Sequence, residues 1–162
     1  MQTGMKDFIK AYCGEVAGES FFVAMAQTAA EPHQRDAWRT LARLENRVAA
    51  RIRSDLKAHG VEVPASETDR QRGQREAEAY AALTWEEALK KMLPELERYV
   101  QEFEAAEGTA PPELLGLAQF VTAHERALVH FVSLALSKDR THSLDAVLML
   151  LGHSAPGPGV AD

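Results

Sequence analysis

The stretch Val121-Thr122-Ala123-His124-Glu125-Arg126-Ala127-Leu128 has the spacing of a buried helix with one glutamate in its apolar stripe. At ~100° per residue, Glu125 falls between Val121 and Leu128, at the centre of that stripe. A carboxylate is almost never fully buried unless it is paired or bound to a metal. A lone glutamate in this position is more often an edge residue or an ion-pair partner, so the interpretation depends on whether the pattern recurs.

The same pattern recurs in two other apolar segments. Glu45 lies between Leu41 and Val48, and Glu15 and Glu19 share one helical face. Three helices that each direct a carboxylate inward predict a shared polar centre, which is a metal site, a proton-sharing carboxylate cluster or a set of buried ion pairs. Two close carboxylates without a cation would raise the pKa of at least one of them. The arginines near enough in sequence to form such pairs are Arg39, Arg43, Arg47 and Arg126.

Hydrophobic periodicity predicts an all-α chain, because no segment alternates with the two-residue period of a strand. The expected helices are 6–30, 36–59, one that starts at Thr84 and is kinked or split at Pro94, 112–137, and a short helix 143–151. Thr84-Trp85-Glu86-Glu87 has the capping-box pattern, and Gly60 is the expected C-cap of the second helix. The polar connection 60–83 is longer than a bundle turn, so we expect a crossover along the bundle.

Size and composition indicate one domain. The chain has 162 residues, of which 1–152 are expected to form a single domain and 153–162 a disordered Pro/Gly-rich tail. The formal net charge of −6 argues against a nucleic-acid partner. No apolar run approaches the ~18 residues needed to span a membrane, and the N-terminus lacks a signal-peptide pattern. Cys13, the single cysteine, excludes an internal disulfide and a zinc site of several thiolates. We therefore expect a cytoplasmic protein.

Five further residues near these stripes have two interpretations each. In the third helix Glu95 and Glu97 flank the stripe. Either is a solvated residue or turns inward if the helix is distorted, and Glu97 is slightly preferred as the inward one. His124 lies at the margin of the core, where ordinary packing is its first interpretation. Gly14 and Gly18 lie four residues apart and indicate either close packing of a neighbouring helix or room for a metal, a small ligand or a partner helix.

The acid-bearing segments resemble the ferritin-like superfamily, specifically its rubrerythrin-type arm. Residues 15–26 resemble the first helix of that family, 38–48 the second and 121–128 the fourth, and the likeness extends over about 6–136. It implies an up-down-down-up four-helix bundle with a long crossover between the second and third helices, followed here by the short C-terminal helix.

The family carries Glu-x-x-His on its second and fourth helices and holds two metal ions among four glutamates and two histidines. In this chain Val48 and Leu128 occupy the histidine positions, so both motifs are degenerate. An all-carboxylate site favours harder ions such as magnesium, calcium or manganese. The resemblance implies iron or manganese as the cofactor, and the two replacements leave open a site without metal. The implied ligands are Glu15, Glu19, Glu45, Glu97, Glu125 and, after a register adjustment, His124.

Three functional hypotheses follow. The first is a diverged di-iron-type protein with oxidase or oxygenase chemistry at the carboxylate cluster. The second is a non-catalytic bundle that acts by homodimerisation or partner binding, with the glutamates as buried ion-pair partners or relics and helix 143–151 packed on a partner subunit or on its own bundle. The third is a bundle that binds a small-molecule ligand in the gap beside Gly14 and Gly18. The aromatic residues that would serve this last role are Tyr12, Phe22, Trp38 and Trp85.

Overall fold

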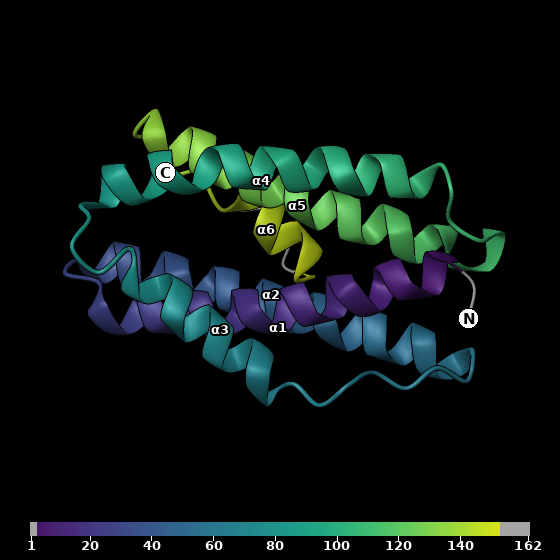
Figure 1. Cartoon of the computed structure of the whole chain (residues 1–162). Coiled ribbons are helices and arrows are strands. Elements are labelled where there is room, and N and C mark those ends of the chain that lie inside the picture. The colour runs from purple at the N-terminus through teal and green to yellow at the C-terminus, as the bar shows by residue number, and fades with distance from the viewer. Residues whose placement is uncertain (1–2, 153–162) are drawn as a thin grey trace.

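Two antiparallel helical hairpins form the body of the molecule (Figure 1). The elements in chain order are α1 (Thr3–Thr28), α2 (Pro32–Ala58), α3 (Glu67–Glu78), α4 (Trp85–Glu107), the 3-10 turn η1 (Pro112–Leu114), α5 (Leu115–Leu136) and α6 (Asp145–Leu150). The computed structural model describes residues 3–152, and over that range the chain is all-helical without strands, which confirms the predicted class. The tail 153–162, expected to be disordered, lies outside the described residues.

Each hairpin is antiparallel, and the two helices joined by the crossover run in the same direction. α1 and α5 run one way and α2 and α4 the other, with the α1–α2 pair below the α4–α5 pair in Figure 1. Contacts between the two hairpins include those of α2 with α5, and α6 packs on both of these helices. The side chain of Val147 in α6 is fully buried in this contact.

The helix ends follow the local chemistry of the sequence. α2 begins at Pro32, four residues before the expected start, because a proline without an N–H fits the first turn of a helix. At its other end Gly60 has a φ of +73°. The Gly60 N–H donates to the Lys57 carbonyl and the Val61 N–H to the Leu56 carbonyl, both at 3.0 Å. These are the hydrogen bonds of a glycine-terminated helix, as the sequence predicts.

The start of α4 confirms the predicted capping box. The Glu87 N–H donates to Thr84 Oγ1 at 3.3 Å, and the Thr84 N–H donates to Glu87 Oε2 at 2.8 Å. The helix then continues through Pro94 without splitting. The side chains of α4 therefore keep one register along its length, and no break near Pro94 turns its acids toward the core.

A helix in the crossover packs across α1. α3 is polar along most of its length, and the residues it buries are Gly73 and Ala77. A Cβ atom built on Gly73 would lie 2.1 Å from the Ala17 carbonyl oxygen, so the two helix backbones approach too closely for any side chain there. Ser20 Oγ donates to the Arg70 carbonyl at 2.8 Å and adds a polar contact to the same interface. The crossover is thus fixed against α1 rather than looping freely.

Aromatic rings join the two hairpins at one end. Phe22 of α1 stacks on Trp38 of α2 with ring centroids 5.8 Å apart, and Trp38 lies 4.8 Å from Trp85 of α4. Phe131 of α5 meets the edge of Trp38 at 6.2 Å. Each of the four long helices contributes one ring, so burial of this group stabilises the pairing of the hairpins directly.

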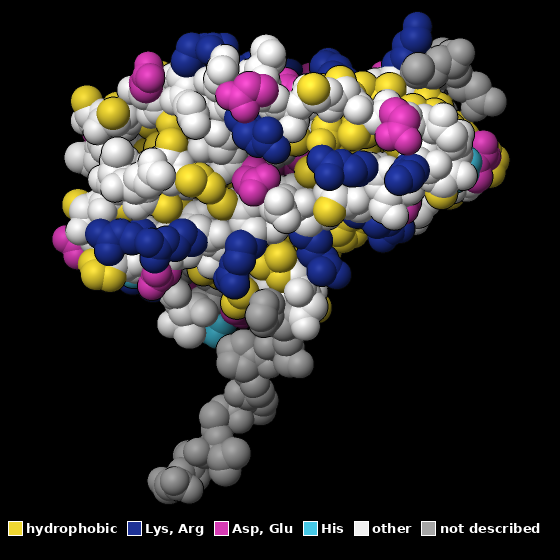
Figure 2. Space-filling view, turned by 90° about the horizontal axis from the view of Figure 1, so that it is seen from below, with side chains coloured by type: hydrophobic (Ala, Val, Ile, Leu, Met, Phe, Trp, Pro, Cys, Tyr) yellow, Lys and Arg dark blue, Asp and Glu magenta, His cyan; other side chains and the backbone are white. Residues whose placement is uncertain are grey.

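The outer face beneath the α1–α2 pair carries mixed charge. Figure 2, which views the molecule from below, shows basic and acidic side chains interspersed, with small groups of apolar side chains between them. Over the described part of the chain, no helix combines the length and the apolar character that crossing a bilayer requires.

The close approach at Gly73 generates a stability prediction. Gly73→Ala should lower the free energy of unfolding by about 1–3 kcal/mol, because the added methyl group must push α3 away from the α1 backbone. Gly116→Ala in α5 is the matched control, since a Cβ there has no neighbour within 4 Å among the described residues. The control should raise the stability by up to about 1 kcal/mol through helix propensity. Urea unfolding monitored by circular dichroism measures both, and a Gly73→Ala chain as stable as wild type would contradict the packing described.

Candidate functional site

Four polar side chains from three helices meet in the core between the hairpins. Glu15 comes from α1, Glu45 from α2, and His124 and Glu125 from α5. Their exposed fractions are 3%, 4%, 0% and 6%, so all four belong to the interior. Each lies on the buried face of an amphipathic helix, where periodicity would otherwise place an apolar residue. We call these four residues the acid–histidine cluster.

The imidazole of His124 is the centre of this cluster. Its Nδ1 lies 2.9 Å from the Val121 carbonyl oxygen, which accepts only, so Nδ1 carries a proton and donates it. Its Nε2 therefore faces the carboxylates. Nε2 lies 3.3 Å from Glu45 Oε1, 3.1 Å from Glu15 Oε2 and 3.9 Å from Glu125 Oε1. One nitrogen thus faces carboxylate oxygens from three different helices.

Burial and mutual repulsion shift the protonation of these groups. Burial, reinforced by the negative charge of Glu15, raises the pKa of Glu45 to about 8. Burial likewise raises the pKa of Glu125 to about 7, although the charge of His124 opposes the shift. For His124 itself burial lowers the pKa, but the three surrounding carboxylates together outweigh it and hold the pKa well above its ordinary value. Protons therefore stay in this cluster at pH values where exposed glutamates have lost theirs.

Two carboxylate oxygens of the cluster have no hydrogen-bond partner among the described residues. They are Oε2 of Glu15 and Oε2 of Glu125. Glu15 Oε2 is close to His124 Nε2 but badly aligned, whereas Glu45 Oε1 accepts a hydrogen bond from the same nitrogen. An unpaired buried polar atom costs about 1–3 kcal/mol, and a charged carboxylate costs more. The cluster is therefore incomplete in its polar contacts.

The two glycines of α1 have different roles beside the cluster. A Cβ on Gly18 would lie 2.6 Å from Glu45 Oε2, so the missing side chain makes room for that carboxylate. A Cβ on Gly14 has no neighbour within 4 Å among the described residues, because this part of α1 borders open space. Of the alternatives drawn from sequence, Gly18 therefore provides room for an acid of the cluster, and Gly14 lies beside a groove.

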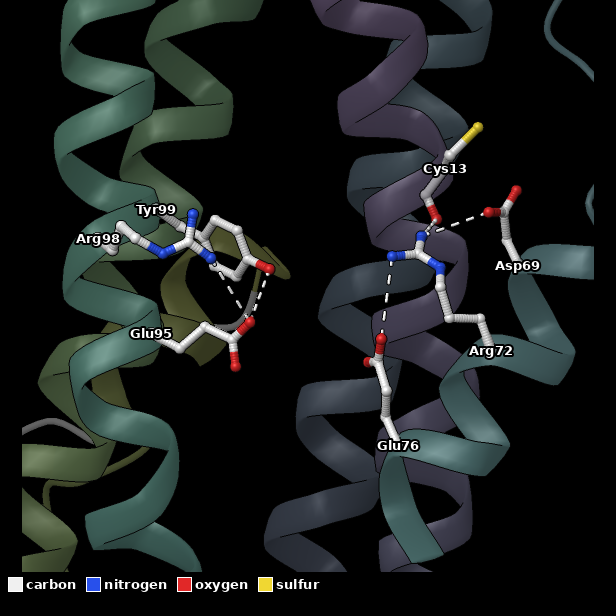
Figure 3. Close-up of polar contacts among 7 residues, drawn as sticks. All are labelled: Cys13, Asp69, Arg72, Glu76, Glu95, Arg98 and Tyr99. Carbon is white, nitrogen blue, oxygen red and sulfur yellow. Dashed lines mark hydrogen bonds and ion pairs between the residues drawn. The ribbon is translucent and has the colours of Figure 1, made fainter. Parts of the chain in front are cut away.

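That groove runs between α1 and α4 and reaches the cluster. It has a volume of about 930 Å³, and Glu15, Glu45 and Glu125 are among its lining residues. Figure 3 shows its two rims, where Glu95 and Tyr99 of α4 face the α1–α3 side. The Tyr99 hydroxyl donates to Glu95 Oε1 at 3.0 Å. Small molecules in solution therefore have a route toward side chains that are otherwise sealed in the core.

Two of the six predicted ligands lie outside the cluster. Glu19 is half-buried at the edge of the α1–α2 interface, where it accepts a hydrogen bond from Asn46 Nδ2 at 3.2 Å. Glu97 is exposed on α4. Its neighbour Glu95, the other candidate in that helix, lines the groove but is also exposed. Over its described length α4 contributes no acid to the cluster.

The role of His124 is missed when α5 is described by a single apolar stripe. The helix buries two adjoining stripes, because it packs against α2, α4 and α6 at once. His124 lies on the second stripe. That row of buried residues, spaced by three and four beside the predicted stripe, contains His124, Ala127 and Phe131.

Three members of the cluster have the chemistry of a cation site. Glu15, Glu45 and His124 each offer one ligand atom, and these atoms lie within 4.8 Å of one another. Carboxylate oxygens with one imidazole nitrogen suit manganese, iron or zinc. Without a cation the same atoms can form only a network of shared protons around His124.

Comparison with known proteins finds no family model, no curated protein and no solved structure that matches the chain. The interpretation of the site therefore depends on the geometry of its own residues.

The raised pKa values predict how stability depends on pH in metal-free protein. A carboxyl whose folded pKa exceeds its unfolded value of 4.5 stabilises the folded state at low pH and loses that contribution as the pH rises. For Glu45 the loss should extend from about pH 4.5 to about pH 8. The free energy of unfolding of wild type minus that of Glu45→Gln should therefore fall steadily across this window.

Urea unfolding in the presence of EDTA at four pH values measures this difference. Glu97→Gln is the matched control, because its side chain is exposed and outside the cluster. Its stability should follow that of wild type at every pH. A difference between wild type and Glu45→Gln that is constant or rises with pH would show that Glu45 does not hold a proton in the folded chain.

Proposed function

We propose that the chain is a diverged ferritin-like protein that binds a single divalent metal ion, manganese or iron, at Glu15, Glu45 and His124. The fold assignment is supported by the two antiparallel hairpins, the opposed directions of α2 and α5, and the long crossover between α2 and α4 (Figure 1). The observation that carries the metal assignment is the convergence of three buried ligand atoms within 4.8 Å.

The residues present fit a cation by three independent criteria. Glu15 Oε2 lacks a hydrogen-bond partner among the described residues, and a cation would satisfy it. The Nδ1–H of His124 is already held by the Val121 carbonyl, which is the arrangement that orients metal-ligating histidines. The remaining nitrogen, Nε2, faces the two carboxylates that would share the ion. Binding would release the Nε2 proton, because a histidine ligand must be neutral on the bonding nitrogen.

The side chains favour one ion over two. The family pattern uses four glutamates and two histidines for a pair of ions, whereas this cluster holds three glutamates and one histidine. Val48 and Leu128, at the family's histidine positions, are buried apolar residues with no donor atom. Glu125 lies outside the group of three ligand atoms, at 3.9 Å from His124 Nε2. We therefore assign Glu125 to the groove side of the site rather than to the ion.

A bound manganese or iron ion would supply oxidase or oxygenase chemistry. The chain's own residues would do three things beside it. The helices exclude bulk water from Glu15 and Glu45, Glu125 holds a proton at its carboxyl group near neutral pH, and the groove admits a small molecule from the α1–α4 side. An acid with a pKa near 7 is suited to giving and receiving protons under physiological conditions.

A non-catalytic role is the second candidate, and one contact favours it. His124 Nε2 already donates a hydrogen bond to Glu45 Oε1, so the cluster has a partly satisfied form that needs no metal. In that case the buried charges would fix the register of α1, α2 and α5, and the protein would act through its surface.

Metal binding by defined variants separates the two candidates. Wild type stripped with chelator should bind about one Mn²⁺ per chain, followed by electron paramagnetic resonance of free Mn²⁺, and should bind Fe²⁺ anaerobically. Glu45→Gln should weaken Mn²⁺ binding more than about 100-fold, because even changes to outer-shell partners weaken metal binding by about 10–100-fold.

Glu97→Gln removes the same charge as Glu45→Gln and is again the control. Its affinity for Mn²⁺ should equal that of wild type. Retention of no more metal by wild type than by Glu45→Gln would contradict the metal assignment and leave the non-catalytic role. Circular dichroism of each variant confirms that a loss of binding is not a loss of folding.

A further inference from the structure

The groove between α1 and α4 has a size and wall composition suited to a small molecule. Its volume of about 930 Å³ lies within the range of about 300–1,000 Å³ that ligand pockets occupy. Most of the wall is apolar, and it includes rings from three parts of the chain. The aromatic lining residues are Phe8, Phe21, Phe22, Tyr80, Tyr99 and Phe103.

Acidic side chains outnumber basic ones in the lining of the groove, although Arg98 pairs with Glu95 and Glu102 at the α4 rim. Among the described residues, seven acidic and three basic side chains line it. Two of the bases are already engaged at the rim. Arg72 lies 3.3 Å from Asp69 and 3.9 Å from Glu76, and Lys91 Nζ donates to the Ala79 carbonyl at 3.4 Å (Figure 3 shows the Arg72 contacts). The third, Lys10, is exposed.

The inner end of the groove holds an unsatisfied carboxylate. Glu125 is 6% exposed and lines the groove, and its Oε2 has no hydrogen-bond partner among the described residues. The nearest positive group, His124 Nε2, is 3.9 Å from its other oxygen and is shared with Glu15 and Glu45. Arg126 pairs instead at 2.8 Å with Glu104 on the surface. The position therefore lacks a donor, and preferably a positively charged one.

We propose that this groove binds an apolar small molecule carrying a protonated amine, with the ammonium group bound by Glu125 and the apolar body packed along the aromatic wall. A cation supplies both the missing hydrogen bond and the missing charge. Aromatic faces add a favourable interaction with an ammonium group and none with an anion.

Other ligand classes satisfy less of the site. A carboxylate or phosphate would be placed beside Glu15, Glu45 and Glu125 in an interior that screens charge poorly. A neutral alcohol would complete the hydrogen bond but leave the negative charge unbalanced. The groove should therefore bind an amine more tightly than an alcohol or a carboxylate of the same chain length.

This inference does not require the metal. Glu125 lies outside the three ligand atoms assigned to the ion, so the amine site should exist in chelator-treated protein.

Calorimetric titration with three probes of one chain length tests the ligand class. The probes are n-octylamine, n-octanol and octanoate, added to metal-free protein at pH 8. Octylamine should bind at least about tenfold more tightly than either other probe, since a hydrogen bond between charged groups is worth about one to two decades in affinity. Equal affinity for octylamine and octanol, or preference for octanoate, would overturn the proposal.

Two variants locate the site. Glu125→Gln should weaken octylamine binding about tenfold and leave octanol binding unchanged. Gly14→Leu should abolish binding of both, because its side chain would enter the open groove without a clash at Cβ. Glu97→Gln should bind all three probes as wild type does. Octylamine binding that survives both Glu125→Gln and Gly14→Leu would place the ligand elsewhere and refute the site.

The result is separable from the metal assignment. Gly14→Leu should retain Mn²⁺ binding, because a Cβ at that position has no neighbour within 4 Å among the described residues. Failure of the amine titration with intact Mn²⁺ binding would reject only the ligand class. Failure of Mn²⁺ binding with intact amine selectivity would reject only the metal.

Discussion

The imidazole of His124 is the contact on which the interior of this protein depends. It is fully buried, donates through Nδ1 to its own helix and faces carboxylates of α1, α2 and α5 through Nε2. Without it, three ionised glutamates in that space would repel one another in a poorly screened interior, so more of them would have to hold a proton. Loss of a buried charge partner typically destabilises a protein by about 3–5 kcal/mol. The same nitrogen therefore links three helices and limits the chemistry available to the cluster.

The arrangement of the hairpins explains why a groove reaches the cluster from the α1–α4 side. Aromatic rings centred on Trp38 and Trp85 join the hairpins at one end, and α2 contacts α5 along the inside. α3 is held against the outside of α1 at Gly73 and so does not fill the space toward α4. The groove remains on that side, with Glu125 at its inner end. The fold therefore leaves the cluster open to small molecules on the α1–α4 side, because few contacts close that side.

The sequence predicted the helices other than α3, which lies in the segment expected as a crossover, and most of the cluster, and the exceptions have physical causes. Glu15, Glu45 and Glu125 were found because each interrupts an apolar stripe. His124 was first interpreted as an ordinary packing residue, because a single apolar stripe suits a helix that packs against one neighbour. α5 packs against several helices. Glu19 is one turn from Glu15 but rotated by about 40°, which places it at the helix edge beside Asn46 rather than inside. The packing of neighbouring helices, and not the periodicity of the sequence, decides such small rotations. It also decides the exposure of Glu97.

The protonation state of His124 tests the central claim most directly. Nitrogen-15 NMR of the imidazole in metal-free protein at pH 7 should show protons on both Nδ1 and Nε2, because the surrounding carboxylates raise its pKa. Addition of Zn²⁺, as a diamagnetic stand-in for the proposed ion, should remove the Nε2 proton and leave the Nδ1 proton bonded to the Val121 carbonyl. A neutral imidazole in metal-free protein whose two nitrogen signals do not respond to Zn²⁺ would contradict the account.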